Sequence, residues 1–146
     1  MSNVHTQTDF ESLAALPEFA SFSEILTKLT GVAMSLHSPE GDVRVMYGDG
    51  MRNPLCSRIR LSQTGSGRCT ACDRAHGKKA GETRKSILYT CHAGFLDMIV
   101  PIFVRGVHVA SISSGQILAA PPSKAAQSKL KTRLAYLKLD DDAFGR

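Results

Sequence analysis

The chain has 146 residues, of which 42% are hydrophobic and 21% are charged, and its formal net charge is +5 at pH 7. This length suits one domain with a single core, and the composition is that of a globular protein. No apolar run approaches the ~20 residues that a membrane-spanning helix needs, and the first residues lack the basic flank and apolar stretch of a signal peptide. The sequence therefore predicts a cytoplasmic domain with no membrane segment.

The N-terminal part predicts a helix and then a β-hairpin. Residues 1–20 are expected to be a flexible segment or the beginning of the first helix. Ser21 and Glu24 have the spacing of a capping box, and apolar residues recur behind them at helical period. Gly31 is a suitable end, so we expect a helix at about 21–30. Two strand-like runs, VAMSL and VRVMY, flank the turn-forming segment HSPEGD and predict the hairpin.

The middle part predicts two helices and three strands. The segment LCSRIRLS predicts a short helix, and a loop at Gly65–Gly67 is expected to lead into a longer helix at about 68–83. Three strand-like runs follow, SILYTC, LDMIVPIFV and VHVASISSGQIL. The Arg105-Gly106 step between the last two is short enough for a second hairpin.

The last part predicts one more helix. Pro121-Pro122 breaks the chain, and Ser123 is a suitable helix cap. One apolar stripe follows, formed by Ala126, Leu130, Leu134 and Leu137. The order of elements predicts an α+β fold: an antiparallel sheet of about five strands with helices packed on it, as in PAS and GAF sensor domains, and a C-terminal amphipathic helix.

The four cysteines are spaced Cys56-x12-Cys69-x2-Cys72-x18-Cys91. Cys69 and Cys72 are neighbours on one helix face, and a helix packed on the sheet would bring them close to Cys91. Four thiolates would suit Zn²⁺ or an iron–sulfur cluster. Alternatively, Cys56 and Cys91 are small buried apolar residues and the helical pair is incidental. The spacing leaves both interpretations open.

The histidines offer few clear ligands. If the strand through Cys91 continues, His92 faces the opposite side, so we expect the two neither to bind one ion nor to form a nucleophile–base pair. His76, four residues after Cys72, could replace a thiol ligand, although a helix-surface position is commoner. The other histidines are expected to be exposed or on a polar strand face: His5, His37 and His108.

The segment Arg52–Lys85 is strongly basic, with nine Lys and Arg residues against Asp73 and Glu82. Such a segment could attract phosphate groups. It contains no aromatic residue on which a nucleic-acid base could stack. A solvated helix face and a nucleic-acid surface therefore both remain open.

Several short motifs lie between about residues 30 and 118. They are Leu55-Cys56, Arg68-Cys69-Thr70-Ala71-Cys72-Asp73, Tyr89-Thr90-Cys91-His92-Ala93-Gly94-Phe95-Leu96-Asp97, Val100-Pro101-Ile102 and Gly115-Gln116. Together they resemble the PocR-type sensory domain, most specifically at the Cys-His-Ala-Gly segment 91–94. The chain departs from the family pattern at Phe95, where leucine is usual, and at Ala110, where glycine is frequent.

The resemblance implies a PAS-like domain that senses a small molecule, a simple hydrocarbon derivative such as a diol, alcohol or aldehyde, and that is not an enzyme. Such domains are usually fused to an AraC-type DNA-binding domain, a histidine kinase or a nucleotide cyclase, and they signal as homodimers. We therefore expect the sensory domain at 21–120 and, at 121–146, a connector helix that is cut before an output domain. DNA would be bound only through that output domain.

A ligand pocket is expected near the ends of the last three strands. Its candidate ligand-binding residues are Tyr89, His92, Phe95, Asp97 and Gln116. Its candidate metal ligands are Cys56, Cys69, Cys72 and Cys91. A mostly apolar hollow with a few placed polar groups is how proteins hold small neutral ligands. His92 and Asp97 are the first candidates, because Gly94 permits a turn that lets both point inward.

Two alternatives compete with the sensor interpretation. One is a GAF-fold thiol redox enzyme similar to the free methionine-sulfoxide reductases, in which Cys69, Cys72 or Cys91 attacks the substrate and a second thiol resolves the intermediate. The other is a module that binds nucleic acid through the basic segment.

Overall fold

The computed structural model of the chain describes residues 10–119, 121 and 123–139. It contains one five-stranded sheet in which all neighbouring strands are antiparallel. From one edge to the other the strands are β2 (Val43–Tyr47), β1 (Met34–His37), β5 (Val107–Ile117), β4 (Leu96–Val104) and β3 (Ile87–Thr90). The prediction of an α+β fold with an antiparallel sheet of about five strands is confirmed. The expectations for His5 and for the last residues, from 140 on, lie outside the described residues.

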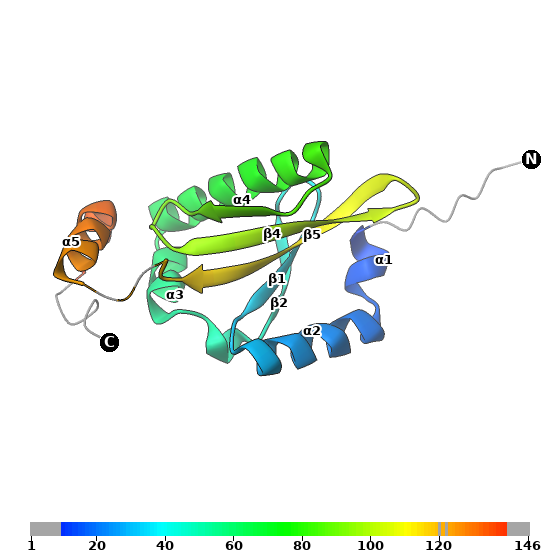
Figure 1. Ribbon diagram of the computed structural model, residues 1–146, viewed down its shortest axis with the longest axis horizontal. Helices are drawn as coiled ribbons and strands as arrows, with labels where there is room; N and C mark the ends of the chain where they lie inside the picture. Colours follow the sequence, from blue (N-terminus) through cyan, green and yellow to red (C-terminus); the bar gives the residue numbers. More distant parts are fainter. Residues whose placement is uncertain (1–9, 120, 122, 140–146) are drawn as a thin grey trace, which may run out of the picture.

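Helices cover both faces of the sheet (Figure 1). The helical elements are α1 (Phe10–Ala14), α2 (Pro17–Thr30), the 3₁₀ turn η1 (Asp49–Met51), α3 (Pro54–Leu61), α4 (Gln63–Thr83), α5 (Lys124–Arg133) and the 3₁₀ turn η2 (Ala135–Leu137). The α1–α2 pair packs on one face, and α4 crosses the other face above β3 and β4. Within the described residues, no helix has both the length and the apolar character required to span a membrane.

The α2 helix begins four residues earlier than predicted. Pro17 occupies its first turn, where a proline fits because its φ is already helical and its missing N–H is not needed. Ser21 therefore lies inside the helix and does not cap it, so the capping-box prediction is wrong. The predicted end is confirmed, because Gly31 adopts a left-handed φ of 69° and its N–H donates to the Thr27 carbonyl.

The α4 helix also begins earlier than predicted, and the expected loop at Gly65–Gly67 forms its first turns. Ser62 caps the helix, since its Oγ accepts a hydrogen bond from the Gly65 N–H at 2.9 Å. A side chain on Gly65 would collide with the carbonyl of Ile59 in α3. This glycine is required by close packing between α3 and α4 and not by a turn.

His37 is buried, with only 1% of its surface exposed, so the expectation that it faces solvent is wrong. β1 continues through His37, which pairs with Ser111 of β5 and thus lies inside the sheet and not in the turn. Its Nε2 lies 2.6 Å from the Ser113 hydroxyl. His108, on the same side of the sheet, is half-buried, and its ring lies against Gly81 of α4.

The C-terminal segment contains a shorter helix than the range 121–146. α5 ends at Arg133, and the chain turns through η2 so that Leu134 is buried. Leu134 joins a core cluster with Leu55, Ile59 and Phe95, against which Leu130 and Leu137 also pack. The predicted apolar stripe thus faces the domain itself.

Candidate functional site

A cavity of about 50 Å³ lies between α3 and α4 on one side and the sheet on the other. Its walls include side chains from six elements and from the turn that follows β3. They are Ser35, Cys56, Ile59, Arg60, Cys69, Cys72, Asp73, Tyr89, Cys91, His92, Ala93, Asp97, Ser113, Ser114 and Gln116. One buried water requires about 10–15 Å³, so the cavity holds roughly three to five water-sized groups.

The structure brings together the four predicted cysteines and four of the five predicted ligand-binding residues. Phe95 is the exception, because it is buried in the neighbouring core cluster with Leu134 and does not line the cavity. Strand alternation explains part of this gathering: Tyr89 pairs with Asp97, and Asp97 pairs with Gly115 across three adjacent strands. The Tyr89 and Asp97 side chains consequently share the face that α4 covers.

Asp97 is held in place by the last residues of β5. Its Oδ1 accepts a hydrogen bond from the Gln116 N–H at 2.8 Å, and a side chain on Gly115 would collide with its carboxylate. Burial raises the pKa of Asp97 above its ordinary value, and the hydrogen bond from Gln116 opposes this shift. The Gln116 side chain is itself engaged, because its Oε1 accepts from the Asn53 N–H at 2.9 Å. Gln116 thus joins the end of β5 to the beginning of α3.

An ion pair that the sequence analysis missed also forms part of the wall. Arg60 of α3 and Asp73 of α4 lie 3.0 Å apart and are mostly buried. One indication in the sequence that Asp73 belongs to the site is that it directly follows Cys72 in the Arg68–Asp73 motif. The pairing with Arg60 depends on the tight connection between α3 and α4, close to the position where a loop was predicted.

The cavity thiols are neutral at physiological pH. Burial raises the pKa of Cys56 to about 12 and that of Cys69 and Cys72 to about 11. Burial also raises the pKa of Cys91. A protonated thiol is a weak nucleophile and behaves as a small, polarisable apolar group. The cysteines therefore line the cavity as neutral, polarisable thiols, and few of them are ionised to thiolates.

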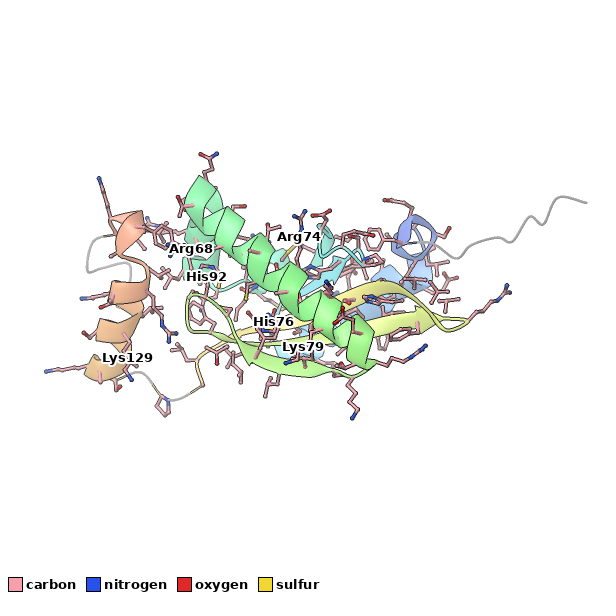
Figure 2. All side chains as sticks on the ribbon, turned by 90° about the horizontal axis from the view of Figure 1, so that it is seen from above. Arg68, Arg74, His76, Lys79, His92 and Lys129 are labelled. Carbon is pink, nitrogen blue, oxygen red and sulfur yellow. The ribbon has the colours of Figure 1, made fainter. Side chains whose placement is uncertain are left out.

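His92 lies beside Cys69, with its Nε2 3.2 Å from the Sγ atom. β3 ends at Thr90, so the strand alternation assumed for His92 does not apply. The turn is closed by a bond from the Gly94 N–H to the Cys91 carbonyl, and Gly94 has a φ of 100°. Burial and, secondarily, the charge of Arg68 lower the pKa of His92. Figure 2 shows His92 near Arg68, close to the N-terminal end of α4.

The metal interpretation of the cysteines gains no support from their arrangement. In the part of the chain that the structure describes, no three His, Cys, Asp or Glu side chains are grouped so that they could hold one ion. His76 is occupied otherwise, since its ring stacks on Tyr89 with centroids 3.7 Å apart and its Nδ1 lies 2.9 Å from the Cys72 carbonyl oxygen. Binding of zinc or an iron–sulfur cluster stays a prediction, which elemental analysis of anaerobically purified protein would test.

The basic residues of α4 make several contacts within the chain. Arg74 forms an ion pair with Asp42 at 2.7 Å, and the Arg68 guanidinium lies over the Tyr136 ring at 4.5 Å. Others, such as Lys79, project outward from the helix (Figure 2). This arrangement agrees with a solvated helix face, while nucleic-acid binding stays a prediction.

Comparisons with known proteins identify the class of this domain. The sensory domain found in PocR matches residues 12–144, and the chain belongs to that family. The regulatory protein PocR of Salmonella typhimurium is 28% identical to it over 103 residues, which cover 65% of this chain and 33% of that protein. Among solved structures, the GAF domain/HD domain protein from Geobacter sulfurreducens covers 90% of this chain and 91% of its own, with a TM-score of 0.44 and 14% identity.

The resemblance seen in the cysteine and histidine motifs is thereby confirmed, and the chain is a sensory domain of a regulatory kind. It spans 33% of the length of the curated relative.

Proposed function

We propose that this domain binds a small neutral hydrocarbon derivative, such as a diol, alcohol or aldehyde, in the cavity between α3, α4 and the sheet. The observation that carries this proposal is the cavity itself, which has about 50 Å³ and collects polar groups from distant parts of the chain. A ligand with about three to five non-hydrogen atoms fits this volume.

The charges of the cavity favour a neutral ligand. Arg60 is paired with Asp73, so its charge is offset within the wall, and Asp97 adds a further carboxyl group that would repel an anionic ligand. Asp97 retains acceptor capacity besides the oxygen that binds the Gln116 N–H, and a ligand hydroxyl could donate to it. The neutral thiols supply weakly polar walls for the hydrocarbon part of such a ligand.

We infer that the signal leaves the cavity through the C-terminal segment. Three cavity residues, Cys56, Cys69 and Cys91, also pack against the cluster that contains Leu134. A side chain on Gly94 would collide with Arg133, so the turn that carries His92 touches the end of α5. A ligand that shifts this turn would also shift α5. The output we propose is an AraC-type DNA-binding domain in a cytoplasmic homodimer, with no catalytic activity in the sensory domain.

A thermal-shift screen tests ligand binding. Small diols, alcohols and aldehydes are expected to raise the melting temperature, since a ligand at 100 times its Kd stabilises a protein by about 2.7 kcal/mol. Carboxylates of the same size should give no shift. Asp97→Asn should abolish the shift, while Asp42→Asn, at an exposed position, should keep it. If no member of the panel shifts the wild-type protein, the proposal fails.

The thiol redox enzyme is a second candidate because of one contact. Cys69 and His92 lie 3.2 Å apart, which is a nucleophile–base separation. The pKa of about 11 for Cys69 opposes this function, since the thiol stays protonated. Reduction of a sulfoxide with a thiol reductant, lost in Cys69→Ser, would favour the enzyme over the sensor.

A further inference from the structure

The outer face of α2 carries large apolar residues. Phe22, Ile25 and Leu29 are 55%, 56% and 78% exposed. The same helix turns the small polar side chains of Ser23 and Thr27 into the domain, where both are buried. Phe19 and Leu26 of α2 also pack on the core, as an amphipathic helix requires, so the exposed apolar residues form a second apolar face on the outer side. Large apolar residues gathered on one exposed face mark a surface that another molecule covers.

The spacing of this face is that of a helix–helix seam. Glu18, Phe22, Ile25 and Leu29 follow one another at intervals of four, three and four residues. This is the a/d pattern with which two helices interlock their side chains. Figure 1 shows α2 along the outer side of the domain, away from α3 and α4. A second helix can therefore reach the seam without disturbing the cavity.

We propose that two copies of this domain pair through their α2 helices in antiparallel orientation. This proposal rests on the homodimer of the proposed function and locates its interface. The charges at the two ends of the seam select both partner and direction: Glu18 lies at the N-terminal end, and Lys28 lies next to Leu29 at the C-terminal end. An antiparallel pair about a two-fold axis places each Glu18 near Lys28 of the second copy and each Phe22 against Ile25 of the second copy. A parallel pair would place the two Glu18 carboxylates together.

The C-terminal helix does not offer a comparable surface. Leu130, Leu134 and Leu137 pack into the core cluster beside the cavity, and α5 exposes mainly polar residues. Pairing through this stripe would require α5 to detach from the domain. Pairing through α2 requires no rearrangement of the described residues.

The seam is short, so the dimer is weak. From Glu18 to Leu29 it spans roughly 17 Å, at 1.5 Å per residue. Such an interface buries less than the roughly 1,200 Å² found in stable complexes. Association is consequently reversible and depends on protein concentration.

Sedimentation equilibrium of the full chain, from low micromolar to submillimolar concentration, tests the proposal. The wild-type protein should show a monomer–dimer equilibrium, and Ile25→Lys should be monomeric throughout. The matched control is Leu61→Lys on α3, where the leucine is 87% exposed and lies outside the seam; it should dimerise like the wild type. A monomeric wild-type protein, or an Ile25→Lys variant that still dimerises normally, would overturn the proposal.

Charge exchange tests the orientation. Glu18→Lys and Lys28→Glu should each weaken the dimer about tenfold, because each turns two attractive pairs into repulsive ones. The double variant restores both pairs and should recover the wild-type affinity. A double variant as weak as the single ones would exclude the antiparallel arrangement. The ligand-induced thermal shift of Ile25→Lys is measured in parallel: because the cavity is intact, it should persist, so a failed dimer test and a failed ligand test are distinguishable.

Discussion

Replacement of Leu134 by alanine tests whether the C-terminal segment is part of the domain core. Leu134 is 1% exposed and packs with Leu55, Ile59, Ala93 and Phe95. Removing its isobutyl group loses the transfer free energy of the buried carbons and leaves a cavity. A leucine-to-alanine change at such a site costs about 2–5 kcal/mol. We expect about 3 kcal/mol, near the middle of this range.

This loss should lower the melting temperature by roughly 6–12 °C in a domain of this size. Urea denaturation followed by circular dichroism measures the change in the free energy of unfolding. Leu61→Ala is the control, since Leu61 is exposed and its replacement should stay within about 0.5 kcal/mol of the wild type. If Leu134→Ala is no more destabilising than Leu61→Ala, the segment is not docked on the domain, and the proposed signal route through it is refuted.

Three further predictions concern the interior of the domain. First, burial lowers the pKa of His37 below its ordinary value of 6.5, so the unfolded chain binds a proton more readily. The free energy of unfolding should therefore fall as the pH drops below 6.5, because His37 must give up its neutral, buried state. Urea titrations between about pH 7.5 and 5 that show no decline in the free energy of unfolding would contradict this account. Second, with a pKa of about 11, Cys69 should react with iodoacetamide at neutral pH about a hundredfold more slowly than a free cysteine; rapid labelling, followed by peptide mass spectrometry, would instead favour thiol chemistry. Third, Gly115→Ala should displace the Asp97 carboxylate and abolish the ligand-induced thermal shift, whereas Gly67→Ala, on an open side of α4, should keep it. An unchanged shift in Gly115→Ala would exclude Asp97 as a ligand-binding residue.

Much of the architecture follows from local patterns in the sequence. The alternation around the first hairpin, the Arg105-Gly106 turn and the left-handed Gly31 each depend on residues within a few positions of one another, and the structure has these features where they were predicted. Proline and glycine were less reliable guides at helix starts. Pro17 begins α2 ahead of the predicted start at residue 21, and Gly65 serves packing between helices in place of the predicted loop.

The composition of the site was decided by tertiary structure. The sequence by itself determined which residue types carry the chemistry and, through the cysteine and histidine motifs, the family. It could not show that His92 meets Cys69 across 23 positions, that Arg60 pairs with Asp73, or that Phe95 packs into the core beside the cavity. The physical reason is range: turns and periodic faces are set by neighbours along the chain, whereas these contacts form only when α3 and α4 pack on the sheet.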